Sequence, residues 1–321
     1  MQYVRLGKSG LKLSRLGLGA MGFGDTSWRS WVLDLDASRA IFRRAIAAGI
    51  TFIDTCDYYS AGASEEIVGT LVAEHGNRSD LVIATKVGNP MGRDANGRGY
   101  SRKHIINAAE QSLRRLRTDH IDIYQTHIWD PATNLEEMMA AFDHLVRTGK
   151  VLYLGITDMP FWQFATAQFH AERHGLARFV SVQNHYNLLW REDERNLLPF
   201  CRAQGIGLIP YSPMARGFLC ERARRIEGTR TERAKTDDYT YKLYGRPEDE
   251  AVVDRVAELA VARGLQPAQV ALAWVLHQPG VTAPIIGATR VDHVDTAIAA
   301  LDVSLSAEEL KQLQQPYTPR P

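Results

Sequence analysis

Short apolar runs alternate with amphipathic stretches along this chain, and that alternation constrains the fold more than any other feature. The pattern predicts buried strands at about 15–19, 50–54, 81–85, 121–126, 151–156, 179–183, 206–210 and 283–286. It predicts helices at about 36–48, 64–75, 102–117, 134–148, 160–174, 191–204, 248–276 and 290–300. Strands that alternate with helices pair in parallel through helical crossovers, so we expect an α/β fold.

Eight strand–helix units leave two architectures open, a doubly wound open sheet and a closed (β/α)8 TIM barrel. The count of eight and the length of 321 residues favour the barrel. No proline-rich or low-complexity linker divides the chain, so we expect residues 1–321 to form a single domain.

Three further segments are expected in addition to the eight strand–helix units of the barrel. Residues 3–13 contain a Gly/Ser turn between apolar residues and predict an N-terminal β-hairpin. The capping box Ser306-Ala307-Glu308-Glu309 predicts an extra C-terminal helix that ends near Gln314. Residues 221–247 are dense in Arg, Thr and Asp and predict a long loop over one face.

Composition excludes several classes of partner. A net charge of +1 is no reason to expect nucleic acid or a membrane surface, and no run approaches the roughly eighteen apolar residues of a membrane span. The first residues lack the apolar core of a signal peptide. Cys56, Cys201 and Cys220 are odd in number and have no paired spacing, which is typical of a reducing compartment, so we expect a cytoplasmic protein.

Two motifs imitate well-known sites. Residues 17–22 satisfy G-x-G-x-x-G after a predicted strand, but the chain continues as a loop, whereas the Rossmann fingerprint requires a helix to start inside the motif. His170 and His174 have the spacing of a zinc-protease helix, yet Glu172 stands at the wrong offset and no third ligand is obvious. We therefore expect a strand-and-turn segment at the first motif, a solvated helical face at the second, and no metal site.

Four predicted strands end in polar residues, namely Asp54, Lys86, His127 and Gln183. In a closed barrel these ends converge on one mouth, and Tyr59 follows Asp54 closely enough to join them. Each has an ordinary structural interpretation: Asp54 could cap the next segment, Lys86 could extend to solvent, and His127 could be a satisfied core histidine. Several such ends at one mouth favour a functional site.

Tyrosine, lysine, aspartate and histidine together suit one kind of chemistry. A tyrosine alone is a poor acid at neutral pH because its unperturbed pKa is about 10. A nearby ammonium favours the phenolate and eases proton release, a carboxylate would keep that lysine charged, and a histidine could orient a carbonyl. The group can protonate an oxyanion as it forms. It contains no activated nucleophile and no metal cage, so the electrons must come from a bound cofactor.

Several segments, in order along the chain, resemble the aldo-keto reductases. Those around the candidate residues are Phe52-x-Asp54-Thr55-Cys56-Asp57-x-Tyr59, Thr85-Lys86-Val87-Gly88 and Gln125-x-His127-x-Trp129-Asp130. Later ones are 150–156, 182–188, 210–219 and 284–290. The resemblance runs essentially from end to end and is strongest to the microbial reductases related to the potassium-channel β-subunits. It implies a barrel enzyme that reduces carbonyl compounds with NADPH.

By position, the resemblance implies that Tyr59 is the proton donor, that Asp54 and Lys86 tune it, and that His127 orients the substrate carbonyl. It also implies a cofactor site formed by Met21, Asp54, Thr157, Asp158, Gln183, Tyr211, Ser212, Pro213, Met214, Gly217, Leu219, Gly287, Thr289, Arg290 and His293. Tyr211 would stack on the nicotinamide, and Gln183 would bind its carboxamide.

The chain departs from the family pattern at two cofactor positions. Thr157-Asp158 stands where a Ser-Asn pair is usual, so Asp158 places an acceptor where the family has an amide donor. Arg290 matches a basic position suited to the 2′-phosphate, but Thr296-Ala297 replaces a frequent Glu-Asn pair and His293 a frequent Arg or Gln. We expect a preference for NADPH that leaves room for some use of NADH.

The substrate is left open by the sequence. Trp28, Trp31, Tyr58, Trp129 and the 221–247 loop are candidates for the substrate pocket, although these aromatics could instead pack the helical rim. Aryl aldehydes, small dicarbonyls and sugar-derived aldehydes all fit. A second functional class, a cofactor-sensing subunit with vestigial turnover, is the alternative to an enzyme. Nothing in the sequence predicts the oligomeric state.

Overall fold

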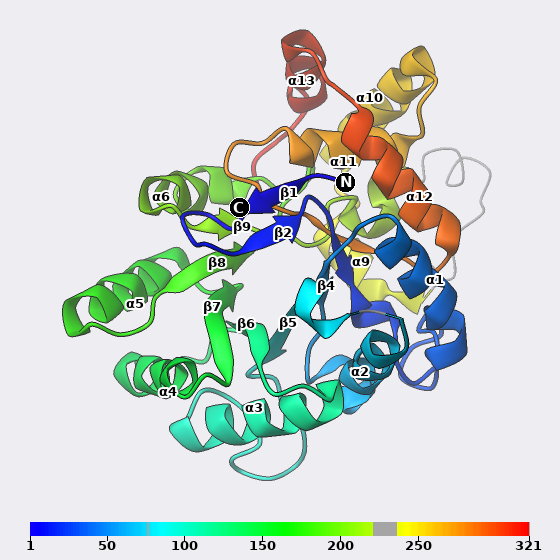
Figure 1. The fold of residues 1–321 in the computed structure, drawn as a ribbon. Coiled ribbons are helices and arrows are strands. Elements are labelled where there is room, and N and C mark those ends of the chain that lie inside the picture. Colours follow the sequence, from blue (N-terminus) through cyan, green and yellow to red (C-terminus); the bar gives the residue numbers. More distant parts are fainter. Residues whose placement is uncertain (76, 221–235, 321) are drawn as a thin grey trace.

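The computed structural model describes residues 1–75, 77–220 and 236–320, with a sheet of eight parallel strands at its centre (Figure 1). In order around the sheet the strands are β10 (Ile285–Gly287), β3 (Gly17–Gly19), β4 (Phe52–Asp54), β5 (Val82–Val87), β6 (Ile121–Thr126), β7 (Val151–Thr157), β8 (Phe179–Gln183) and β9 (Gly207–Leu208). Thr282 N donates to Leu208 O at 2.7 Å and Ile285 N donates to Pro210 O at 2.8 Å, which joins β9 to the segment of β10. The sheet therefore closes, and the predicted (β/α)8 barrel is confirmed.

Helices surround the sheet and are separated from its strands by the main apolar core (Figure 1). They are α1 (Leu35–Ala47), α2 (Ala63–His75), α3 (Arg102–Leu116), α4 (Leu135–Arg147), α5 (Phe161–His174), α6 (Leu197–Gln204), α10 (Pro247–Arg263), α11 (Pro267–Leu276) and α12 (Val291–Ala299). Asp34, Ser101 and Asn134 start α1, α3 and α4 by accepting a hydrogen bond from a backbone N–H of the first turn.

The two faces of the strands pack in separate clusters. Ile53, Ile83 and Tyr124 belong to the cluster between sheet and helices, whereas their neighbours Phe52 and Ile123 belong to the cluster inside the barrel. This follows from the period of two in a strand, which sends successive side chains to opposite faces. The same alternation decides which polar residues at the strand ends face the barrel interior.

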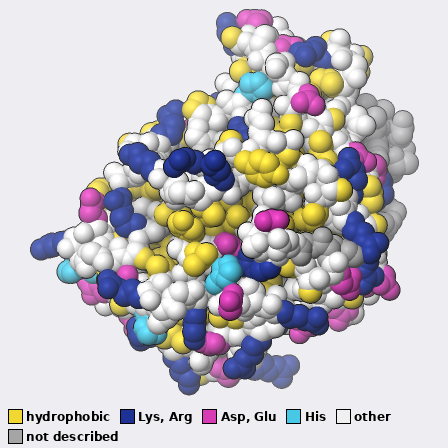
Figure 2. Space-filling model, viewed as in Figure 1, with side chains coloured by type: hydrophobic (Ala, Val, Ile, Leu, Met, Phe, Trp, Pro, Cys, Tyr) yellow, Lys and Arg dark blue, Asp and Glu magenta, His cyan; other side chains and the backbone are white. Residues whose placement is uncertain are grey.

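An antiparallel hairpin of β1 (Tyr3–Arg5) and β2 (Lys12–Ser14) covers one end of the barrel, as predicted (Figure 1). Leu6 and Leu13 are fully buried in the interior cluster with strand residues. Gly7 has a positive φ of 56°, and a β-carbon there would lie 2.2 Å from the carbonyl oxygen of Gly205, so this turn requires glycine. Figure 2 views the hairpin side and shows hydrophobic side chains near its centre with charged groups around them.

The stretch 248–276, predicted as one helix, is two helices. α10 ends at Arg263, Gly264 adopts the left-handed conformation (φ 62°), and Pro267 begins α11. A left-handed glycine ends a helix and a proline suits the first turn of the next one, so the sequence contained this break. None of the described helices is by itself long and apolar enough to cross a membrane; α10 and α11 would qualify only as a pair, and they are bent by 104°.

Two other boundaries differ from the prediction. The helix expected at 191–204 starts only at Leu197, after a 3-10 turn at Glu192–Glu194. Residues 221–235 of the predicted loop lie outside the described residues, and the part from 236 onward contains a short helix, α9 (Asp238–Leu243). The C-terminal helix, α13 (Ala307–Gln314), is confirmed with its capping box at Ser306 and Glu309.

Removing one apolar side chain of the hairpin is expected to destabilise the barrel. Leu13→Ala should lower the free energy of unfolding by about 2–5 kcal/mol, because it leaves a cavity among interior residues that cannot close completely. Urea unfolding followed by circular dichroism measures this loss, and Leu152→Ala, at a site that is 42% exposed, is the control. Equal losses in both variants would show that the hairpin does not close the core.

Candidate active site

Polar side chains form one level inside the barrel, next to its apolar packing. Asp54 ends β4, Lys86 lies near the end of β5, Gln125 lies on β6 and Gln183 ends β8. All four side chains are buried. Parallel strands present their carboxyl ends at the same side of a barrel, so the closed sheet brings together residues that are far apart in the sequence.

Lys86 connects this level to Tyr59. The ammonium Nζ donates to Asp54 Oδ2 at 2.7 Å, to the carbonyl oxygen of Thr55 at 2.8 Å and to the hydroxyl of Tyr59 at 3.3 Å. Its three hydrogens therefore each have an acceptor. A buried ammonium with complete hydrogen bonding and a carboxylate partner keeps its charge without water.

The second oxygen of Asp54 is also occupied. Gln183 Nε2 donates to Asp54 Oδ1 at 2.7 Å, and Gln125 Nε2 donates to the same oxygen at 3.2 Å. Three donors from three strands thus hold the carboxylate as an anion beside Lys86. Gln183 was expected to face a cofactor, and the structure shows that its amide nitrogen is already engaged.

Tyr59 reaches Lys86 because the chain turns sharply after β4. It begins a 3-10 turn (Tyr59–Gly62) in which Ser60 and Ala61 have positive φ angles of 49° and 52°. Left-handed residues other than glycine cost energy and are kept only where packing imposes them. The turn holds the Tyr59 ring over Lys86, with Nζ at 4.9 Å from the ring centroid.

Burial and neighbouring charges shift the pKa values of Tyr59 and Lys86 in opposite directions. Burial raises the pKa of Tyr59, and although the Lys86 ammonium pulls in the opposite direction, the net pKa is above the ordinary value. Burial alone would lower the pKa of Lys86, but the Asp54 carboxylate outweighs it and the net pKa is raised. The expectation that Lys86 eases proton release is therefore only part of the balance. At neutral pH Tyr59 is a phenol and Lys86 is an ammonium.

His127 follows β6 and is held by neighbours on both sides. Its backbone N–H donates to the carbonyl oxygen of Val87 at 2.9 Å, and its ring meets Tyr59 edge-on at 5.7 Å between centroids. Asn89 Nδ2 lies 2.7 Å and Cys56 Sγ 2.9 Å from His127 Nδ1. Burial, followed by the charge of Lys86, lowers the pKa of His127 to about 3, so the ring is neutral.

The neighbours of His127 assign its tautomer. An amide nitrogen donates only, so His127 Nδ1 must accept from Asn89. A neutral imidazole with an accepting Nδ1 carries its hydrogen on Nε2. His127 is therefore a neutral donor through Nε2.

Three residues of this site were not predicted from the sequence. Gln125 lies on β6, two positions before His127, so the period of two could have placed it. Asn89 follows the Lys86 strand, but nothing local indicates that it meets His127. Cys56 was part of the quoted motif without a role, and burial raises the pKa of its thiol well above the usual value.

Besides Asp54 and Gln183, the residues expected to hold a cofactor follow or end β3, β7, β9 and β10. After β7, Thr157 Oγ1 is buried with no hydrogen-bond partner, and Asp158 accepts from the Tyr211 hydroxyl at 3.1 Å. The Tyr211 ring stacks with His185. Met21 lies in the 3-10 turn Ala20–Gly22 after β3.

The segment after β9 forms a strained turn. Ser212, Ala215 and Arg216 have positive φ angles of 53°, 50° and 58°, and Gly217 has 95°. The remaining expected residues of this turn are Pro213, Met214 and Leu219. Within the turn, the backbone N–H of Ala215 donates to Ser212 O at 2.9 Å and that of Gly217 donates to Met214 O at 3.0 Å.

The segment after β10 carries the expected phosphate residues. Gly287 ends the strand, and the backbone N–H of Thr289 donates to His293 Nδ1 at 3.4 Å. Arg290 Nε and Nη2 donate to the two oxygens of Asp292 at 2.9 and 2.6 Å. The Arg290 side chain is 57% exposed, so solvent or a ligand can compete for it.

One of the four candidate pocket aromatics, Trp28, lies beside Tyr59 and contacts a second candidate, Tyr58. Trp28 lies 6.4 Å from Tyr59 and 6.2 Å from Tyr58 between ring centroids. Trp31 is buried, and Trp129 packs against the main core. The structure thus brings Trp28 to Tyr59, while Trp31 and Trp129 have substantial packing roles.

The first imitated motif folds as the predicted strand and turn. Residues 17–19 form β3 and are followed by a 3-10 turn, and α1 begins only at Leu35. The rings of His170 and His174 lie on α5 with their centroids 4.4 Å apart and their planes tilted by 36°. Across the described part of the chain, no three His, Cys, Asp or Glu side chains are grouped as metal ligands.

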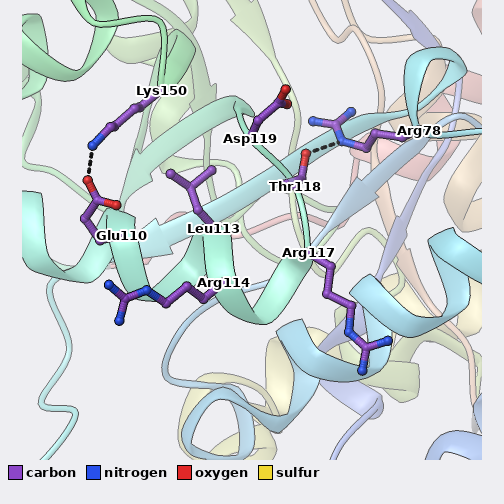
Figure 3. Close-up of a pocket in the computed structure, with 8 residues that line it drawn as sticks. All are labelled: Arg78, Glu110, Leu113, Arg114, Arg117, Thr118, Asp119 and Lys150. Carbon is purple, nitrogen blue, oxygen red and sulfur yellow. Dashed lines mark hydrogen bonds and ion pairs between the residues drawn. The ribbon is translucent and has the colours of Figure 1, made fainter.

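A surface hollow of about 700 Å³ lies away from this site, beside α3 and the start of β6 (Figure 3). Its wall consists of Arg78, Glu110, Leu113, Arg114, Arg117, Thr118, Asp119 and Lys150. Lys150 pairs with Glu110, and Arg78 donates to Thr118 at 2.9 Å. The hollow is at the amino ends of the strands, opposite the level of Asp54 and Lys86, and contains none of the candidate catalytic residues.

Asp57 is a buried residue next to the site, and its surroundings disfavour the charged form of its carboxyl group. It is 1% exposed, and its Oδ2 has no partner. Burial, and next the charge of Glu65, raise the pKa of Asp57 to about 7. An acid whose folded pKa is raised loses stability as pH rises from the unfolded pKa towards the folded one.

Asp57→Asn is therefore expected to raise the free energy of unfolding at pH 8 by up to about 4 kcal/mol relative to wild type. This gain in stability should become progressively smaller as pH falls towards 4. Urea unfolding of both proteins across this pH range measures the difference. The exposed Asp80→Asn should show a small effect that is independent of pH. A constant gain for Asp57→Asn at all pH values would contradict the assignment.

Comparison with known proteins agrees with this geometry. The model of the "Aldo/keto reductase family" matches residues 15–317. The chain is 42% identical to a versiconal hemiacetal acetate reductase of Aspergillus parasiticus, over 100% of the chain and 98% of the relative. It is 41% identical to a putative aryl-alcohol dehydrogenase of Schizosaccharomyces pombe (99% and 96% covered) and 38% identical to an aldo-keto reductase of Alternaria alternata (99% and 92%). With a barrel and a buried Tyr59–Lys86–Asp54 group that suit carbonyl reduction, the chain belongs to the aldo/keto reductase family.

Proposed function

We propose that this protein reduces an aldehyde or ketone to the alcohol with NADPH and that Tyr59 is the proton donor. The observation that carries the proposal is the position of Lys86 Nζ, which contacts both the Asp54 carboxylate and the Tyr59 hydroxyl. The His127 ring meets the Tyr59 ring edge-on at 5.7 Å between centroids, and Nε2 is its donor. Two donors therefore converge where a carbonyl oxygen would gain negative charge.

When bound, the reduced nicotinamide supplies a hydride to the carbonyl carbon. Tyr59 O–H gives its proton to the carbonyl oxygen as the C=O π bond becomes a C–H and an O–H bond. Lys86 stabilises the phenolate that remains, and Asp54 keeps Lys86 charged and in place. His127 Nε2–H donates to the same oxygen and orients the carbonyl.

Unused hydrogen-bonding groups at the mouth fit a nicotinamide. Thr157 Oγ1 is a buried donor without a partner, which suits a carboxamide oxygen. Gln183 gives its amide nitrogen to Asp54, so its oxygen would accept from the carboxamide nitrogen. Asp158 can accept but not donate while ionised, and Tyr211 offers a flat ring for stacking. We assign the turn 212–219 and the segment 287–293 to the phosphates.

Trp28 favours a flat carbonyl substrate, because its ring lies beside Tyr59 and also contacts Tyr58. The relatives named for aryl-alcohol and versiconal hemiacetal acetate support an aryl or polycyclic substrate class. Trp31 and Trp129 would complete the pocket wall. A cofactor-sensing role is not favoured, because the complete proton-donating group serves turnover. We further propose a single cytoplasmic domain over 1–321.

The central test is Tyr59→Phe. We expect this variant to bind NADPH as wild type does, because the phenol acts on the substrate, and to lose at least about 99% of kcat, since general acid catalysis contributes about 10²–10⁴-fold. NADPH consumption with a panel of aryl aldehydes measures turnover, and fluorescence titration measures binding. A fully active Tyr59→Phe would refute the proton-donor assignment.

Arg290→Ala tests the choice of cofactor. Removing a guanidinium that binds the 2′-phosphate should raise the KM for NADPH about tenfold or more, and leave the KM for NADH within about twofold. Steady-state kinetics with both cofactors measure the split, and Arg255→Ala on the outer surface of α10 is the control. If neither KM changes, Arg290 has no phosphate role.

A further inference from the structure

The ring expected to stack on the nicotinamide is connected to the C-terminal segment by a series of flat groups. Tyr211 stacks with His185 at 5.2 Å between centroids and 10° between planes, and His185 stacks with Trp190 at 4.6 Å and 22°. The guanidinium of Arg320 lies over Trp190 at 5.2 Å from the ring centroid. We call these four residues the stacked chain.

Arg320 is anchored by more than this contact. Its Nη2 donates to Asp249 Oδ1 at 2.8 Å, its Nε donates to the carbonyl oxygen of Leu189 at 2.7 Å, and its backbone N–H donates to Glu192 Oε1 at 2.7 Å. The Arg320 residue is 9% exposed. Segments near a chain end are usually mobile unless tied down, and these contacts order the tail together with those of Tyr317 to Glu192 and Arg191.

The Asp249 carboxylate that receives Arg320 is itself organised. Its Oδ2 accepts from the backbone N–H groups of Gly245 and Arg246 at 2.9 and 3.1 Å, at the start of α10. Both side chains of the Arg320–Asp249 pair are less than 10% exposed. A buried pair with this geometry holds the guanidinium at a defined position relative to Trp190.

The middle of the stacked chain is also held in place. His185 Nε2 pairs with the Tyr244 hydroxyl, and Asn187 Nδ2 donates to that hydroxyl at 3.0 Å and to the carbonyl oxygen of Ser212 at 3.0 Å. Tyr211 has fewer restraints of its own: its hydroxyl donates to Asp158 and its backbone N–H donates to Asn184. The plane of its ring therefore depends on His185.

We propose that Arg320 is a positioning residue for cofactor binding, because it fixes the plane of Tyr211 through Trp190 and His185. The proposal rests on the proposed function, in which Tyr211 stacks on the nicotinamide. A ring already held in its binding orientation loses less conformational entropy when the cofactor arrives. Coupling is reciprocal, so cofactor binding should in turn order the segment that carries Arg320.

The experiment is a double-mutant cycle on cofactor affinity in the full chain. NADPH is titrated into wild type, Arg320→Ala, His185→Leu and the double variant, with protein fluorescence as the signal. Arg320→Ala should raise the Kd for NADPH about threefold to tenfold, the effect of one immobilised side chain, and leave kcat at saturating NADPH within about twofold. In the His185→Leu background the same substitution should have almost no effect.

Two variants control for ordinary structural damage. Arg263→Ala removes the ion pair with Glu309 of α13 at 2.6 Å, in the same C-terminal region but outside the stacked chain, and should leave the Kd unchanged. Arg320→Lys keeps a charge for Asp249 but cannot stack as a planar guanidinium, so it should also raise the Kd, by about twofold to threefold. It tests the proposal even if Arg320→Ala does not fold.

A second readout needs no turnover. Hydrogen exchange of residues 315–320 should slow on addition of NADPH in wild type, and not in His185→Leu. The proposal is overturned if Arg320→Ala leaves the Kd unchanged, or if its effect is the same with and without His185. A wild type that does not bind NADPH would instead refute the proposed function. If Tyr211→Ala weakens binding and Arg320→Ala does not, only the role of Arg320 is wrong.

Discussion

The buried pair of Lys86 and Asp54 is the interaction on which the rest of the site depends. An ammonium and a carboxylate are costly to remove from water, and they remain charged here because each has its hydrogen bonds completed by groups from other strands. That requirement explains why Gln125 and Gln183 both donate to a single carboxylate oxygen. It also explains the closed barrel as a scaffold, because only closure brings four strand ends to one buried point.

The same low-polarity surroundings set the protonation states around this pair. Burial favours the neutral forms of Tyr59 and His127, while Asp54 preserves the charge of Lys86. The result is one phenol and one neutral imidazole, both able to donate, beside one fixed positive charge. A carbonyl oxygen that becomes negative in such a place is stabilised without any rearrangement of solvent.

Stacking extends the organisation of the mouth well beyond the reacting groups. Tyr211 stacks with His185, which stacks with Trp190, and the latter packs under Arg320 near the end of the chain. The helix α10 contributes through Asp249 in its first turn. Rigid packing of this kind is how a remote residue can influence a binding site.

The sequence by itself determined the eight strand–helix units, because strand and helix periods are local, and it favoured a barrel with Asp54, Tyr59, Lys86 and His127 near one mouth. Closure of that barrel was decided by the tertiary structure. The break between α10 and α11 was also marked locally, by Gly264 and Pro267, and could have been predicted from the sequence. Only the tertiary structure decided which buried polar groups form hydrogen bonds and ion pairs with one another. Gln183 and Asp54 are 129 positions apart, and Arg320 and Asp249 are 71 apart, so no local pattern records these contacts. Burial likewise set the pKa of Tyr59, since the cost of removing charge from water depends on the whole fold.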